Sequence, residues 1–100
     1  MPFEVFTHNR LLAKELRDSA PSGVSTSVGR THDDPGWIVI TLEFVRDTAF
    51  AVDIHLFAAW LCTKCKDQDC RIKHEGKTVP PEEVVIRRIA SEDLETGETD

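Results

Sequence analysis

The sequence predicts an α+β domain in which short strands and amphipathic helices follow one another along one hundred residues. Residues 3–7 and 37–45 are rich in β-branched and aromatic side chains, which is typical of strands. Residues 8–20 and 48–65 repeat apolar side chains at helical spacing. A chain of this length suits one domain with a single hydrophobic core.

The first strand and the first helix are predicted at residues 3–7 and 8–20. The helical segment carries apolar side chains at intervals of four residues, with charged side chains between them. Asn9 or Thr7 can cap its first turn, because their side-chain oxygens accept hydrogen bonds from free backbone N–H groups. The segment Pro-Ser-Gly at 21–23 ends the helix. The apolar residues are Leu12, Leu16 and Ala20.

Residues 24–30 and 37–45 are predicted as two strands joined by a turn. The first alternates weakly between apolar and small polar side chains, and Pro35 followed by Gly36 favours a type II turn. Alternation divides the second strand into two faces, of which one is expected in the core and the other only partly covered. The core face contains Ile38, Ile40, Leu42 and Phe44. The second face contains Trp37, Val39, Thr41 and Glu43.

The second half of the chain is predicted to contain a long helix, a hairpin and a last helix. Asp47 can cap a helix over 48–65, whose wide apolar stripe indicates a central position. Residues 70–79 are expected to form a strand and a tight turn around Gly76. Residues 80–90 begin with Pro-Pro-Glu-Glu and are expected to start the last helix.

This order of elements fits a ferredoxin-like split β-α-β sandwich with an extra C-terminal helix. If residues 24–30 formed a loop, the alternative would be a simple β-α alternation with a mostly parallel sheet. Residues 1–90 are predicted to form the single domain. Residues 91–100 are predicted to be an acidic, flexible tail, because they carry five acidic residues and no basic one.

The charge distribution narrows the classes of partner. The formal charge is −6, but removing the five acids of the tail from the total of eighteen leaves thirteen acids against twelve bases in residues 1–90. A fold without a basic field argues against a nucleic-acid partner. The longest nearly apolar run, "FAVDIHLFAAWLC", is shorter than the roughly 20 residues that cross a bilayer, and the first residues lack a leader pattern. We therefore expect no membrane partner and a cytoplasmic location.

All three cysteines and a histidine lie within thirteen residues, "CTKCKDQDCRIKH". Cys62, Cys65, Cys70 and His74 supply the number and type of ligands that tetrahedral zinc takes. If residues 70–74 form a strand, however, about 13 Å separates Cys70 from His74, which is too far to share one ion. The C-x-x-C pair lies at the expected C-terminal end of a helix, where the dipole opposes a reactive thiolate. Reduced structural thiols and a zinc site remain the two alternatives.

Between residues 60 and 79 an expected helix ends in Trp-Leu and basic residues, a strand of basic and apolar residues follows, and then comes Gly-Lys-Thr-Val. This pattern resembles the second half of the effector-associated constant component domains of bacteria, and the resemblance covers about residues 37–90. It implies a non-enzymatic module fused to or encoded beside effector enzymes in bacterial signalling and conflict systems, acting by protein contact. The resemblance implies no catalytic residues. The matching positions are Trp60, Leu61, Lys64, Arg71, Ile72, Gly76, Lys77, Thr78 and Val79.

The function predicted from these features is a protein-interaction or adaptor module whose partner is a protein such as an effector enzyme. No phosphate-binding loop, nucleophile elbow or zinc-protease motif occurs in the sequence, so we expect no enzymatic activity and no catalytic residues. The alternatives are a small zinc-binding module that uses the cysteine cluster and an enzyme subunit of unknown reaction. Homo-oligomerisation stays open. The partner-binding candidates are Trp37, Val39, Thr41 and Trp60.

Overall fold

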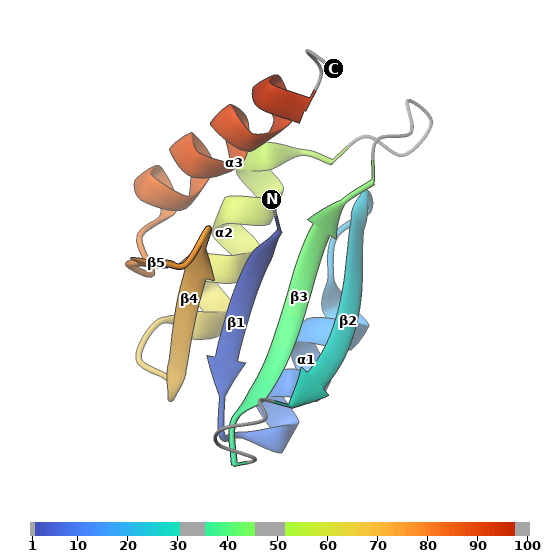
Figure 1. Ribbon diagram of the computed structural model, residues 1–100, viewed down its shortest axis with the longest axis vertical. Coiled ribbons are helices and arrows are strands. Elements are labelled where there is room, and N and C mark those ends of the chain that lie inside the picture. The colour runs from blue at the N-terminus through green and yellow to red at the C-terminus, as the bar shows by residue number, and fades with distance from the viewer. Residues whose placement is uncertain (1, 31–35, 46–51, 98–100) are drawn as a thin grey trace.

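The computed structural model describes residues 2–30, 36–45 and 52–97 (Figure 1). They form a small α+β domain with a five-stranded sheet and three helices. In chain order the elements are β1 (Phe3–Thr7), α1 (Arg10–Ser19), β2 (Val24–Arg30), β3 (Ile38–Phe44), α2 (Ile54–Cys65), β4 (Cys70–His74), β5 (Lys77–Val79) and α3 (Glu83–Gly97).

The sheet is antiparallel throughout its described strands. Its strand order is β2-β3-β1-β4-β5, so β2 and β5 are the two edges. The weak alternation at 24–30 does form a strand, and it pairs with β3 along its whole length, from Val24 opposite Phe44 to Arg30 opposite Ile38. The alternative prediction of a mostly parallel sheet is therefore wrong, because residues 24–30 form a strand that pairs antiparallel with β3.

The helices cover one face of the sheet. In Figure 1 both α1 and α2 lie behind the sheet, and α3 packs against α2. The core lies between these layers, and its aromatic centre consists of Phe57 with the rings of Phe3 and Phe44 at 5.3 and 4.9 Å between centroids. The alternation predicted for β3 is confirmed, because Ile38, Ile40 and Leu42 are buried in this core. The opposite face of the sheet has no helix on it in the described part of the chain.

The helix starts follow from side-chain caps. Of the two predicted caps, Asn9 and Thr7, it is Asn9 that caps α1, its Oδ1 accepting hydrogen bonds from the N–H groups of Leu11 and Leu12 at 3.0 and 3.3 Å. The predicted start of the second helix is wrong, because Asp53 has extended backbone angles and caps α2, which begins at Ile54. Asp47 and residues 48–51 lie outside the described residues. Apolar periodicity does not by itself locate a first turn, so either aspartate could have been the cap.

The last two elements also differ in detail from the expectation. The predicted hairpin is confirmed: Glu75 and Gly76 both have positive φ, 53° and 77°, as a two-residue turn between antiparallel strands requires. The last helix, α3, runs to Gly97, so residues 91–97 of the predicted acidic tail are helical. Ile86 and Ala90 are both buried, so one face of this helix is held against the domain. Among the described residues, none of the helices is long and apolar enough to cross a membrane.

Candidate partner-binding face

The uncovered side of the sheet, here called the open face, carries the side chains of β1, β3 and β4 that alternate with the buried ones. Strand register places Phe6 at its centre, opposite Val39 on one side and Arg71 on the other. In the next row, Glu4 lies opposite Thr41 and Lys73. Phe6 and Val39 are half-buried, whereas Arg71 is exposed. The open face thus has an apolar centre beside a basic strand.

Trp37 lies at one end of the open face and contacts two charged or polar neighbours. Its ring lies against the His8 imidazole, with 3.7 Å between centroids and 33° between planes. The guanidinium carbon of Arg71 lies 5.4 Å from the Trp37 ring centroid, within the range of a cation–π contact. The half-buried indole is therefore oriented by surface groups, and part of it stays accessible to a partner.

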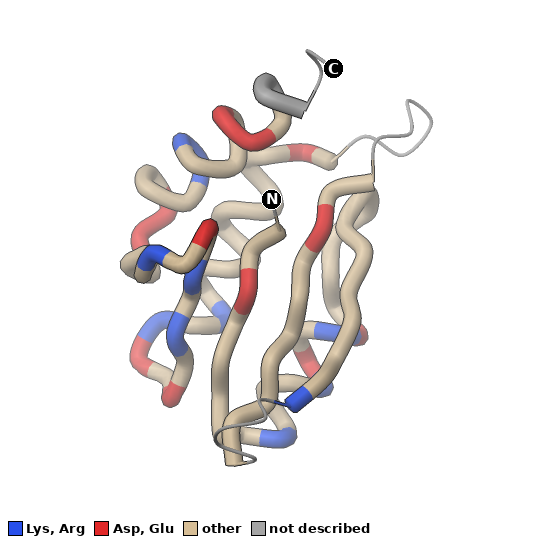
Figure 2. Tube along the Cα trace, in the orientation of Figure 1, with Lys and Arg blue, Asp and Glu red and all other residues tan. Residues whose placement is uncertain are grey.

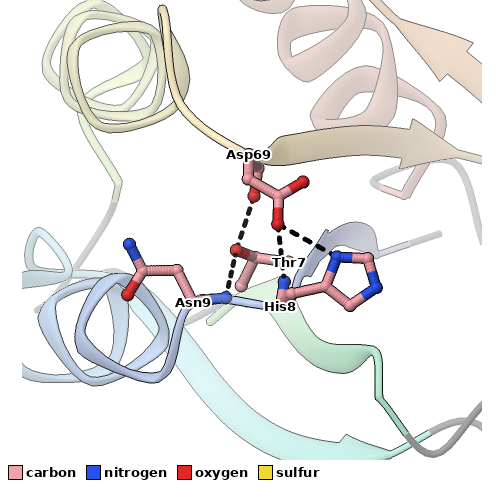
Figure 3. A network of polar contacts seen from close by, with 4 residues as sticks. All are labelled: Thr7, His8, Asn9 and Asp69. Atoms are coloured by element: carbon pink, nitrogen blue, oxygen red, sulfur yellow. Dashed lines mark hydrogen bonds and ion pairs between the residues drawn. The ribbon is translucent and has the colours of Figure 1, made fainter.

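A small hydrogen-bond network holds the imidazole that supports Trp37 (Figure 3). The Thr7 hydroxyl donates to the Asp69 carbonyl at 2.6 Å and accepts from the Asn9 N–H at 3.0 Å. The His8 backbone N–H donates to Asp69 Oδ2 at 3.3 Å, and His8 Nδ1 lies 3.0 Å from the same oxygen. The contacts tie the end of β1 to the residue before β4. In neutral His8 the Nδ1–H tautomer fits this contact and leaves Nε2 as an acceptor.

The second aromatic side chain of the open face also has a cation beside it. Lys73 Nζ lies 5.3 Å from the Phe6 ring centroid, and Glu4 lies opposite Lys73 in the strand register. The half-buried rings of Trp37 and Phe6 thus each lie next to one basic side chain. The carboxylates of Glu4, Glu43 and Asp69 lie on or beside the same face. The face is amphipathic and close to neutral in charge.

The structure brings three of the four predicted partner-binding residues together. Trp37, Val39 and Thr41 share the open face, as the alternation along β3 predicts. Trp60 lies in the helical layer on the other side of the sheet. Its ring lies 6.1 Å from that of Phe57, and its Nε1 donates to Ser19 Oγ at 3.0 Å, which joins α2 to α1. Trp60 is therefore not part of the open face.

Four residues of this candidate surface were not predicted from the sequence as part of it, namely Phe6, His8, Asp69 and Arg71. The alternation within β1 could have shown that Phe6 projects from the other face of the strand than the buried Phe3 and Val5. The contact between His8 and Asp69 joins residues 61 positions apart and depends on the pairing of β1 with β4. No local pattern carries that information.

The four proposed zinc ligands do not all lie at one point, because His74 lies away from the three cysteines. Cys70–His74 is the extended strand β4, which separates its two end residues as the strand interpretation required. His74 lies at the far end of that strand, with its ring 4.7 Å from that of Phe3 and its Nε2 3.5 Å from Asp93 Oδ1. Across residues 2–30, 36–45 and 52–97, no three His, Cys, Asp or Glu side chains are placed to hold a metal ion. The four predicted ligands therefore do not surround one ion in this arrangement.

The three cysteines instead lie near one another, around the buried thiol of Cys65. All three are free thiols, and Cys65 is almost completely buried. A hydrogen bond with Cys70, burial, and the proximity of Cys70 and Cys62 together raise the pKa of the Cys65 thiol far above its usual range. The Cys62 thiol lies 3.2 Å from the Pro81 carbonyl oxygen, where it can donate a hydrogen bond. A thiol held protonated in the core is a packing group and a poor nucleophile.

Comparisons with protein-family models, with curated proteins and with solved structures gave no match for this chain. Function is therefore inferred from the geometry of its surfaces.

Proposed function

We propose that this protein is a non-enzymatic interaction module whose protein partner docks on the open face of the sheet. The observation that carries the proposal is a sheet face bearing the half-buried rings of Phe6 and Trp37, with both helices that pack on the sheet lying on its other side. Clustered aromatic and arginine side chains are the residues that most often contribute binding energy at protein interfaces. The open face combines them with Val39 and Thr41.

The shape and charge of the face favour a protein over other ligands. Two cavities of the described part of the chain, one next to α1 and one between α2 and α3, are lined by residues outside the open face. Arg71 and Lys73 are balanced by nearby carboxylates, and a polyanion such as RNA would meet Glu4, Glu43 and Asp69 there. A partner with an apolar patch and a carboxylate facing Arg71 fits best.

The proposal also includes a ferredoxin-like topology and a relationship to effector-associated constant component domains. The order β2-β3-β1-β4, with α1 and α2 as the two connections on one face, supports a ferredoxin-like split β-α-β arrangement to which β5 and α3 are added. The resemblance of Trp60–Leu61 and Gly76–Val79 to effector-associated constant component domains supports a bacterial effector enzyme as the partner. A cytoplasmic adaptor role is the corresponding biological setting.

The experiment places a photo-crosslinking amino acid at Val39 in living cells, with the same amino acid at the exposed Thr63 of α2 as the matched control. We expect a discrete protein adduct from position 39 that position 63 does not give. Once that partner is purified, Trp37→Ala should weaken its binding about tenfold or more, and Trp37→Phe should restore part of the loss. Equal adducts from both positions, or unchanged binding by the Ala variant, would remove the open face as the interface.

A further inference from the structure

A second surface, separate from the open face, lies between α1 and the end of β2. Arg10, Lys14 and Arg17 line a cavity of about 390 Å³ from the helix, and Arg30 lines it from the strand. The three helical residues are spaced by four and three positions, so their side chains project from the same side of α1. Ala13 and Ile38, both nearly buried, border the apolar part of this cationic groove.

Within residues 2–30, 36–45 and 52–97, little negative charge compensates Arg10 and Lys14 of the cationic groove. No acidic residue lines it among the described residues. Arg17 contacts Asp18 at 3.1 Å, but both side chains are 53% exposed, and such a surface pair contributes little. Arg10 and Lys14 have no ion pair within the part of the chain that the structure describes. Like charges held together favour the binding of an anion, which relieves their repulsion. In Figure 2 basic segments of α1 lie beside the basic end of β2.

The strand beside the groove is an open edge of the sheet. β2 is seven residues long, contains no proline, and pairs only with β3 among the described strands. Val28 is 48% exposed on the helical side, and the other side carries only Ser25, Ser27 and Gly29. An edge strand presents a row of backbone N–H and C=O groups to which another extended segment can pair.

From the open edge and the groove together, we propose that β2 accepts an added strand from an acidic segment of a partner protein. Alternate carboxylates of the added strand would lie over the cationic groove, while its backbone pairs with β2. Side chains on one face of a strand repeat about every 7 Å. Arg10 and Lys14 are about 6 Å apart along the axis of α1, so the two spacings are compatible. The cationic groove would select an acidic segment by charge, and pairing with the backbone of β2 would require that segment to be extended.

A second copy of this chain is a poorer occupant of the same edge. Antiparallel pairing of two β2 strands would make one continuous sheet with both α1 helices on the same side. The groove residues Arg10, Lys14 and Arg17 of each copy would then lie near those of the other, and like charges across an interface disfavour association. Charge complementarity therefore selects an acidic segment.

The first test uses a labelled eight-residue peptide in which Glu alternates with Val, with binding followed by fluorescence anisotropy at low salt. We expect Lys14→Glu to weaken binding about tenfold or more, and Arg10→Glu to do the same. The control Lys66→Glu, an exposed charge reversal at the end of α2, should change affinity by less than about twofold. A peptide with Lys in place of Glu should not bind. Equal loss in Lys14→Glu and Lys66→Glu would overturn the groove as the site.

The second test separates strand addition from simple charge attraction. Two further peptides keep the same side chains but carry N-methyl groups on either the odd or the even backbone nitrogens, which removes alternate N–H donors. We expect one of them to lose binding about tenfold or more, because only one set of donors faces β2. If both bind like the parent peptide, strand addition is overturned. Trp37→Ala should leave peptide binding unchanged, so failure here and failure of the open face as an interface are distinguishable.

Discussion

The Nδ1 atom of His8 lies 3.0 Å from Oδ2 of Asp69, and this contact joins the end of β1 to the residue that precedes β4. The same imidazole supports the indole of Trp37. An exposed acid–histidine pair thus orients the most prominent aromatic side chain of the open face.

Replacing Asp69 should release His8 with little loss of stability. Both side chains are about half exposed, 47% and 55%, so Asp69→Ala should lower the free energy of unfolding by about 1 kcal/mol or less. Without its acceptor, neutral His8 should lose its preference for the Nδ1–H tautomer, and ¹⁵N NMR shifts of the imidazole report this directly. Glu43→Ala, another exposed carboxylate, is the control and should leave those shifts unchanged. An unaltered tautomer in Asp69→Ala would contradict the orienting role.

Replacement of Thr7 should lower the free energy of unfolding more than is usual for a residue at the end of a strand. It is completely buried, and its hydroxyl serves both the Asp69 carbonyl and the Asn9 N–H. Thr7→Val keeps the shape but leaves these groups unpaired, so we expect a loss of about 1–3 kcal/mol in urea denaturation. Thr41→Val on the half-buried open face should change stability by about 0.5 kcal/mol or less. Similar losses in the two variants would show that the Thr7 bonds are unimportant.

The Cys65 thiol should make stability depend on alkaline pH. Its hydrogen bond with Cys70 and its burial raise its pKa in the folded state above the ordinary value of 9.0. The unfolded chain therefore releases this proton first as pH rises, so the contribution is fully present below pH 9.0 and is lost above it. The expected slope is about 1.4 kcal/mol per pH unit in the free energy of unfolding.

Cys65→Ala should remove that slope, measured by urea denaturation from pH 8 to about 10.5. Lysine titration contributes to both proteins, so the difference between the two curves isolates the thiol. Parallel curves would contradict a protonated Cys65 in the folded state. Iodoacetamide provides an independent check, because native Cys65 should react only after unfolding.

The contact between His74 and Asp93 should hold α3 to the sheet. Their side chains are only 11% and 10% exposed, and His74 Nε2 lies 3.5 Å from Asp93 Oδ1. Asp93→Ala removes this neighbour of the imidazole from a mostly buried site, with an expected loss of about 1 kcal/mol in the free energy of unfolding. Hydrogen exchange should become faster in the second half of α3 before it does in β1. Uniform acceleration across the domain, or none, would argue against a local anchoring role.

Short-range patterns in the sequence were sufficient to predict several of the secondary-structure elements and their buried faces. The two faces of β3, the Asn9 cap and the turn at Gly76 each depend on a few neighbouring residues, and each is found in the structure as predicted. The start of α2 was not determined in this way, since both Asp47 and Asp53 have the chemistry of a cap. The wrong choice moved a helix boundary without changing the order of the elements.

The candidate surfaces required the tertiary structure. Pairing of β1 with β4 decides that His8 meets Asp69 and that Phe6 meets Arg71, and the extension of β4 decides that Cys70 and His74 stay apart. The position of β2 at the sheet edge decides that Arg30 lies beside the basic side of α1. Periodicity in the sequence determines which side of an element is buried, because it acts over a few residues. Which side chains meet across elements depends on register and packing, which arise only when the whole domain is assembled.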